Sequence, residues 1–478
     1  MRVILIVASI LGLTGYSYAD TYPKNPKIDV VNYIFRIELS DNTDEIKCVE
    51  TVDVRYTGSG VLALRLDLVN ATMKVSSVTS EGKQLSYTHE NNALVITLPS
   101  APGLNQKISY TITYSGKPAS GLKIANNKYG DRTFFSDNWP DKGRHWLAIV
   151  DHPYDKAMCE FVVTAPSHYQ VVSNGLKIEE TDLKDGNRLT HWKQSVPIAS
   201  WLYVLGVARF AVQHVDDFDH KAIETWVYYQ DRDKGFYDFA IPTKDVLGFY
   251  SDRIGPFVYE KLANIQSNSV SGGMEAASAI LYSEGSVVGD RNQRWRDVVI
   301  HEIAHQWFGN TITEYDWDDV WLSEGFATYF TLLFIEHQYG KDAFMKGLAD
   351  AKKRVNAFQE KNPDYRIVHD NLSDMEKVTS SHTYQKGAWT LHMLHGIMGD
   401  DNFWKGIRSY YKKYMNSSAT TADFRREMEE ASGLDLETFF DQWLYKPGAF
   451  KLNGTWSYDK KKKEVILNLG TSSFAMPV

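Results

Sequence analysis

The stretch Val299–Gly309, VIHEIAHQWFG, places two histidines four residues apart, with a glutamate directly after the first. Apolar residues recur at helical spacing from Trp295 to Phe308, which predicts a helix over this segment. Residues i and i+4 lie one above the other on a helix, so His301 and His305 aim their imidazoles at a common point. The pattern predicts a metal site; the alternative is a buried helix edge on which His301, Glu302 and His305 satisfy one another.

A third ligand follows after a gap of eighteen residues, because Glu324 stands in the segment WLSEGFA near the start of the next expected helix. Two imidazoles and one carboxylate, without thiolates, are a ligand set of catalytic zinc, which keeps its fourth coordination position open for water. Glu302 is turned about 100° around the helix from His301 and can face that water as proton acceptor. We therefore expect one zinc ion per chain and hydrolysis of a peptide bond by an activated water.

Together with their neighbours, these residues resemble the aminopeptidase N family of zinc metallopeptidases, gluzincins in which HExxH is followed after eighteen residues by Glu. The similarity runs through HEIAHQWFGN, DVWLSEGFATYF, TYQKGAW, GLDLETFFDQWLYKPG and, more diffusely, DHPYDKAMCEFVVTAP. It implies zinc ligation by His301, His305 and Glu324, and a general base at Glu302. These roles agree with those expected from the spacing alone.

The resemblance adds roles that spacing does not show. It implies that Tyr384, in TYQKGAW, donates a hydrogen bond to the oxyanion that forms on the scissile carbonyl. Asp137, in FSDNWP, is the charge-appropriate residue for an amine-binding group from the preceding domain, although the family's usual Gln or Glu is absent. Thr328, one turn after Glu324, is expected either to steady the zinc ligands or to be a hydroxyl on the helix surface.

The segment NSVSGGMEAA, residues 268–277, resembles the family's Gly-Ala-Met-Glu-Asn motif. This implies that Glu275, with Gly272 and Gly273 before it, binds the amino terminus of the substrate. The alternative is a glycine turn that carries an ordinary surface glutamate. The sequence departs from the motif twice, because Gly273 replaces alanine and Ala276 replaces the asparagine, whose amide could bind the substrate backbone.

Patterning along the chain predicts a multidomain α+β protein. From Asp29 to about Phe210, apolar and polar residues alternate with period two and glycine turns separate the runs, which predicts an antiparallel β domain. After about His220 the period becomes helical, with helices expected at 322–339, 421–431 and 436–445.

The resemblance divides the chain more finely. It implies an N-terminal β saddle over residues 20–215 and a thermolysin-like, mainly helical zinc domain over residues 216–448. Alternation returns after Pro447, and a single hairpin cannot bury its own apolar face. Residues 449–478 are therefore expected to be the beginning of a C-terminal β domain that is truncated in this sequence.

Residues 1–19 have the pattern of a signal peptide: Arg2, an apolar run from Val3 to Leu13, then small residues that place a cleavage site after Ala19. The apolar run falls well short of the ~20 residues that span a bilayer. We therefore expect an exported protein, periplasmic or extracellular, without a stable membrane span. Sequons at Asn70, Asn371, Asn416 and Asn453 would carry glycans only in a eukaryotic secretory route.

Composition limits the function further. The net charge of −8 is spread without a basic block, which argues against nucleic acid as a partner. Cys48 and Cys159 are the only cysteines, so a disulfide-stapled scaffold is excluded, while a single bridge and two free thiols both stay open.

These observations predict an exported monozinc aminopeptidase whose partners are peptide substrates with a free N-terminus. The alternatives are a zinc endopeptidase with the same chemistry and, by family precedent, an epoxide hydrolase. Glu275 separates the first two, because an amine-binding carboxylate is useful only where the substrate ends. A catalytically dead binding protein is disfavoured, because every zinc and proton-transfer position is filled.

Overall fold

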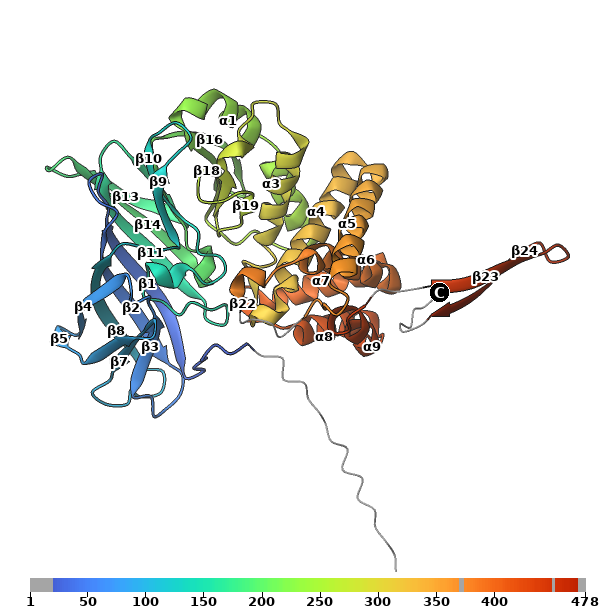
Figure 1. The fold of residues 1–478 in the computed structure, drawn as a ribbon, viewed down its shortest axis with the longest axis horizontal. Helices are drawn as coiled ribbons and strands as arrows, with labels where there is room; N and C mark the ends of the chain where they lie inside the picture. Colours follow the sequence, from blue (N-terminus) through green and yellow to red (C-terminus); the bar gives the residue numbers. More distant parts are fainter. Residues whose placement is uncertain (1–19, 369–373, 449–451, 472–478) are drawn as a thin grey trace, which may run out of the picture.

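The computed structural model describes residues 20–368, 374–448 and 452–471. Figure 1 shows a β-rich N-terminal part beside a second part that combines a smaller sheet with a group of helices. The predicted α+β class, with the β domain first, is confirmed. The expected signal peptide and the sequon at Asn371 lie outside the described residues.

The N-terminal part is built on an eight-stranded sheet in the order β13-β14-β11-β1-β2-β8-β4-β5. Its long strands alternate between buried and more exposed positions, as the period-two pattern predicted. All its pairs are antiparallel except β1 with β11, the one departure from the expected antiparallel arrangement. Its strands are β1 (Ile28–Glu38), β2 (Ile46–Tyr56), β4 (Met73–Ser80), β5 (Lys83–Gln84), β8 (Lys107–Gly116), β11 (Ala157–Pro166), β13 (Leu176–Asp182) and β14 (Asn187–Ile198).

Two smaller sheets complete this part, with the orders β3-β7-β6 and β12-β15-β10-β9. Their strands are β3 (Ala63–Asp67), β6 (Tyr87–Glu90), β7 (Ala93–Thr97), β9 (Leu122–Asn126), β10 (Arg132–Ser136), β12 (Gln170–Ser173) and β15 (Leu205–Ala208). Cys48 on β2 and Cys159 on β11 are both buried free thiols, and β1 runs between their strands.

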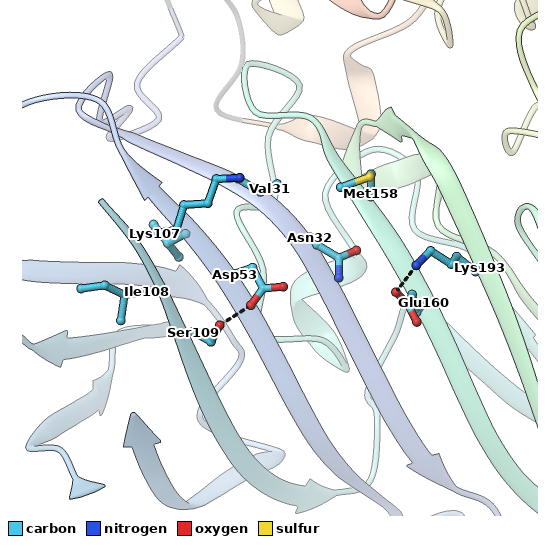
Figure 2. A pocket seen from close by; sticks show the side chains of 10 residues that line it. Val31, Asn32, Asp53, Lys107, Ile108, Ser109, Met158, Glu160 and Lys193 are labelled. Atoms are coloured by element: carbon cyan, nitrogen blue, oxygen red, sulfur yellow. Dashed lines mark hydrogen bonds and ion pairs between the residues drawn. The ribbon is translucent and has the colours of Figure 1, made fainter. Parts of the chain in front are cut away.

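A hollow of about 320 Å³ lies on the large sheet where β1 and β11 both carry an irregularity in register, beside Asn32 and Met158 (Figure 2). Its acidic groups are already partnered. Ser109 Oγ donates to Asp53 at 2.5 Å, and Lys193 pairs with Glu160 at 3.1 Å. This hollow therefore offers no free carboxylate for a ligand.

The second part begins with a five-stranded sheet in the order β16-β17-β18-β20-β19. The expectation of helical structure after about His220 is wrong here. β18 is buried at every position, and a fully buried strand in parallel pairs loses the alternation that marks a strand in sequence. The strands are β16 (Phe210–Phe218), β17 (Lys221–Tyr228), β18 (Lys261–Ser267), β19 (Gly273–Met274) and β20 (Ala279–Ser283).

Nine α-helices are present in the described residues, and the central one, α4, packs against α3, α5 and α6. The expected helices at 322–339 and 421–431 correspond to α4 and α8, whereas 436–445 is α9 followed by a π-helical turn. The helices are α1 (Arg232–Phe239), α2 (Thr243–Arg253), α3 (Gln293–His305), α4 (Trp321–Tyr339), α5 (Lys341–Lys361), α6 (Gly387–Met398), α7 (Asp400–Tyr414), α8 (Thr421–Ser432) and α9 (Glu437–Phe440). A two-stranded sheet joins β21 (Ile312–Glu314) to β22 (Ser417–Ala419) in parallel.

The last described residues form an antiparallel hairpin of β23 (Leu452–Asp459) and β24 (Glu464–Thr471), which extends away from the helices (Figure 1). The hairpin is the only structure described in the expected C-terminal β domain. No helix within the described ranges combines the length and the apolar character that crossing a membrane requires.

Candidate metal centre and active site

Three side chains from two helices converge at the candidate metal site. His301 and His305 come from α3, and Glu324 comes from α4. The two Nε2 atoms are 3.1 Å apart, and Oε2 of Glu324 lies 3.4 Å from His301 Nε2 and 3.2 Å from His305 Nε2. Ligand atoms held tetrahedrally at zinc's usual bond lengths lie about 3.3 Å from one another. The three donors therefore fit one zinc ion as they stand.

The orientation of the His305 ring is fixed by the contacts of its second nitrogen, Nδ1. Its Nδ1 lies 3.1 Å from the carbonyl oxygen of Phe308 and 3.1 Å from Ser323 Oγ. When Nδ1–H donates to that carbonyl, the Nε2 lone pair points to the site, as a metal-binding histidine requires. Ser323 precedes the ligand Glu324 on α4, so both helices contribute to this support.

The site is strongly acidic. Glu275, Glu302 and Glu324 are all buried there, and no lysine or arginine among the described residues pairs with them. Burial and the neighbouring carboxylates raise the pKa of Glu302 well above its ordinary value. For Glu324, burial alone would raise the pKa, but the charge of His305 and hydrogen bonds with the two histidines lower it to about 2. A divalent cation would neutralise the excess negative charge.

Glu302, the predicted general base, lies against the glycine segment. A Cβ added to Gly273 would stand 2.1 Å from Glu302 Oε1, so only glycine leaves this side chain its present position. The replacement of the family's alanine by Gly273 therefore has a direct contact to explain it. Gly272, the other predicted glycine, accepts a hydrogen bond on its carbonyl from the Ser283 N–H.

Glu275 lies beside the candidate metal ligands. Carboxylate oxygens of Glu275 and Glu302 and a ring nitrogen of His305 are all within 4.8 Å of one another. The backbone carbonyl of Glu275 accepts hydrogen bonds from Gln306 Nε2 at 2.9 Å and Asn310 Nδ2 at 2.7 Å. The residue is 5% exposed, and its Oε1 has no hydrogen-bond partner in the described part of the chain. The surface-glutamate alternative is therefore wrong, and a buried acceptor faces the site.

Tyr384 reaches the site from the π-helix His382–Lys386, and its hydroxyl donates to Glu324 Oε1 at 2.7 Å. Two glycines allow this approach. A Cβ on Gly387 would lie 3.0 Å from the Cα of Gly325, so α4 and the start of α6 touch almost backbone to backbone. The predicted catalytic tyrosine is thus brought beside a metal ligand.

Two predicted residues lie in other surroundings. Asp137 follows β10, is half-buried and pairs with Lys142 at 3.2 Å, and it belongs to neither carboxylate cluster at the site. Thr328 donates through Oγ1 to the backbone carbonyl of Glu324 at 2.7 Å, so its hydroxyl supports the helix rather than the ligand carboxylate.

Four contributors escaped sequence reasoning. Ser323, Gln306 and Asn310 lie inside the quoted motifs, but nothing in a motif says which backbone group a side chain will hold. The fourth is Trp201, from the N-terminal part, whose indole N–H makes no hydrogen bond within the described residues but influences the pKa of Glu275. Burial raises the pKa of Glu275, and the charge of His305 and the indole N–H of Trp201 oppose that shift. No local pattern in the sequence connects Trp201 with Glu275.

A second group of potential metal ligands brings together Asp20, His152 and Asp316. Here the positively charged side chain of Lys24 already balances the carboxylates. Lys24 pairs with Asp20 at 2.8 Å and with Asp316, and His152 bonds to the other oxygen of Asp20. The first cluster is open to a metal, whereas Lys24 occupies the second.

Comparison with known proteins places these features in a family. The family model described as "Peptidase M1 N-terminal domain" matches residues 31–202, and that of the "Peptidase family M1 domain" matches residues 241–443. Glutamyl aminopeptidase of Mus musculus is 28% identical over 328 residues, which are 66% of this chain and 34% of that protein. Leucyl aminopeptidase of Saccharolobus solfataricus is 25% identical over 436 residues, 88% of this chain and 54% of that protein. The chain thus spans between about a third and about half of these relatives.

Solved structures agree on the fold. An M1 zinc metallopeptidase from Deinococcus radiodurans superposes with a TM-score of 0.76 at 23% identity, covering 87% of this chain and 93% of that one. A mutant of that enzyme, described as bound to a Tyr-Ser-Ala substrate, gives a TM-score of 0.73 at 22% identity over 88% of this chain and 94% of that one. The two family models together match more than three quarters of the sequence, and the chain belongs to the M1 family of peptidases.

Proposed function

We propose that this protein is an exported aminopeptidase that holds one zinc ion at His301, His305 and Glu324 and removes N-terminal residues from peptides. The observation that carries the proposal is the position of Glu275, a buried carboxylate with an unpartnered oxygen beside the metal ligand His305. The relatives named above are aminopeptidases, and one solved neighbour is described with a tripeptide substrate, which supports the same class of reaction.

Zinc bound at this site would polarise the scissile carbonyl and acidify the attacking water. Glu302 would accept the proton of that water and deliver it to the leaving amine. The phenol of Tyr384, beside Glu324, would donate a hydrogen bond to the oxygen on which negative charge develops. The Glu302 base and the Tyr384 donor enter from different elements, α3 and the π-helix His382–Lys386, so they can act on opposite sides of the bond.

Glu275 distinguishes an aminopeptidase from an endopeptidase. A free peptide amine carries positive charge at or near neutral pH, and the desolvated carboxylate of Glu275 would pair with it. Gln306 and Asn310 fix the backbone of Glu275, so this pairing sets the distance from the N-terminus to the scissile bond. An internal segment of a long peptide has no free terminal amine to pair with this carboxylate.

The test compares free and blocked substrates. Glu275→Gln should lower kcat/KM for free-amine peptides by about 2 to 4 kcal/mol in transition-state free energy, because it removes one partner of a buried charge pair. N-acetylated peptides should be poor substrates of both proteins. If the wild type cleaves N-acetylated and free peptides equally fast and Glu275→Gln behaves like it, the protein is an endopeptidase.

Export is tested separately. The apolar run and the cleavage signal after Ala19 predict that the mature chain begins at Asp20. N-terminal sequencing of protein recovered outside the cytoplasm should give Asp20 as its first residue. Recovery of the full-length chain from the cytoplasmic fraction alone would contradict export.

A further inference from the structure

A cavity of about 550 Å³ opens beside the candidate metal centre. His301 and Tyr384 lie in its wall, whereas neither Glu275 nor Glu302 does. Glu275 thus adjoins the metal site at His305, and the cavity adjoins it at His301. If the amine of a substrate pairs with Glu275, the remainder of the peptide has this cavity as its path, and the volume is of the size that holds small ligands.

The cavity wall has an apolar section and a charged section. Val298, Leu332, Ile335 and Ala343 provide apolar surface near the metal site. The charged groups that line the cavity are Arg294, Arg296, Asp297, Lys346, Asp350 and Arg354. The second set decides which chemical group the cavity can recognise.

Both acidic residues of that set are already neutralised. Asp297 pairs with Arg296 at 2.8 Å, while Asp350 pairs with Lys346 at 3.0 Å and with Lys353 at 3.2 Å. Arg294 and Arg354 have no ion pair within the described part of the chain, and both are exposed. The cavity therefore presents two uncompensated guanidinium groups, which suit a carboxylate.

The helices place these two arginines at the same cavity. On α3, Arg294, Val298 and His301 stand at positions i, i+4 and i+7, so Arg294 shares the face that carries the metal ligand. On α5, Gly347 and Arg354 stand at i and i+7, also on one face. Arg294 is seven residues before His301, which corresponds to about 10 Å along the helix axis.

That separation sets a peptide length. An extended chain advances about 3.3 Å per residue, so the terminal carboxylate lies roughly 7 Å from the scissile carbonyl in a tripeptide and roughly 10 Å in a tetrapeptide. Side chains on a helix lean toward its N-terminus, so the Arg294 position matches the tetrapeptide carboxylate directly, and its long side chain has to turn back to meet that of a tripeptide. In a dipeptide the carboxylate would stay in the apolar section of the wall.

We propose that Arg294 and Arg354 bind the C-terminal carboxylate of the substrate, so that the preferred substrates are peptides of three or four residues with both termini free. This inference rests on the proposed aminopeptidase function and adds a second anchor to it. Glu275 recognises one end of the peptide and the two arginines recognise the other.

The test uses Ala-Ala-Ala and tetra-alanine, each as free acid and as C-terminal amide, with an aminoacyl-coumarin amide as a substrate that has a free amine but carries no carboxylate. For the wild type, the free acids should exceed the amides in kcat/KM by roughly tenfold to a hundredfold, mainly through KM, since the arginine contacts are hydrogen bonds to a charged group. In Arg294→Ala/Arg354→Ala this ratio should fall close to one. Arg408→Ala, which removes an exposed arginine of α7 outside the cavity lining, should keep the wild-type ratio.

Three outcomes would overturn the assignment, and each identifies a different part of the proposal as wrong. If the wild type cleaves the coumarin substrate but treats acids and amides alike, only the arginine assignment fails. If an amidated tetrapeptide with glutamate at its third position matches the free acid, the arginines read side-chain carboxylates and not the C-terminus. If zinc-loaded wild type cleaves none of these substrates, the proposed function fails as well.

Discussion

Two separate histidine–carboxylate clusters in the described part of the chain look alike in composition and differ in what balances their charge. In the first, His301, His305 and Glu324 face one another, and no lysine or arginine of the described residues pairs with the carboxylate. In the second, Lys24 lies between Asp20 and Asp316, and His152 bonds to Asp20.

The pKa values show the difference in the surroundings of the clusters. In both clusters, neighbouring groups lower the pKa of a carboxylate that burial alone would raise: His152 and Lys24 act on Asp20, and His305 and His301 act on Glu324. Glu302, beside the first cluster, differs, because burial raises its pKa, the nearby carboxylates add to that shift, and only His305 opposes it. Proximity of ligand atoms is thus a weak criterion for a metal site, and an uncompensated charge is the stronger one.

The largest expected effect separates the two clusters by metal content. His301→Ala and Glu324→Ala should each lose the bound zinc and nearly all peptidase activity, because each removes a ligand. His152→Ala should keep about one zinc per chain, since Lys24 already pairs with the carboxylates of the second cluster and leaves no site for a metal there. Elemental analysis of the purified variants measures the zinc content. If the wild type holds two zinc ions and His152→Ala loses one of them, the second cluster also binds metal and the two clusters do not differ.

Glu302→Gln separates metal binding at the first cluster from proton transfer beside it. The amide cannot accept the proton of the attacking water, so kcat should fall by about three orders of magnitude or more while zinc stays bound. Steady-state kinetics and metal analysis on the same sample provide the test. A variant that stays active would mean that another group is the base.

Tyr384→Phe should produce a smaller loss. It deletes one hydroxyl that we assign to the transition state, so kcat should fall by roughly 10²- to 10³-fold with little change in KM. Because the same hydroxyl donates to Glu324 Oε1, zinc affinity is the matched control and should change far less than kcat. A loss of zinc in proportion to activity would assign Tyr384 to the support of the metal ligand.

Sequence reasoning succeeded where function depends on local spacing. A helix places His301 and His305 on one face by geometry alone, and Glu324 follows because α4 starts soon after α3 ends. It failed where the relevant contact joins distant segments. The burial of β18 hid a strand, Trp201 influences the pKa of Glu275 from another part of the chain, and Lys24 meets Asp316 across almost three hundred residues.

The comparison can also be tested from the second cluster, by removing the Lys24 ammonium that balances its carboxylates. Lys24→Ala would leave Asp20, Asp316 and His152 with ligand atoms within 4.8 Å of one another and no ammonium between them. The Lys24 side chain is 16% exposed, and loss of its contacts to two carboxylates should lower the free energy of unfolding by about 1 to 3 kcal/mol.

A divalent cation should then replace what the lysine supplied, because a ligand that binds only the folded state stabilises it. Added Zn²⁺ or Mn²⁺ should raise the Tm of Lys24→Ala by a few degrees, beyond its effect on the wild type. Lys377→Ala, which removes an exposed lysine from a surface pair with Asp374, is the control and should show no such gain. If Lys24→Ala loses no stability and gains none from the metal, the ammonium does not balance the second cluster. The difference between the two clusters would then need an explanation other than charge balance.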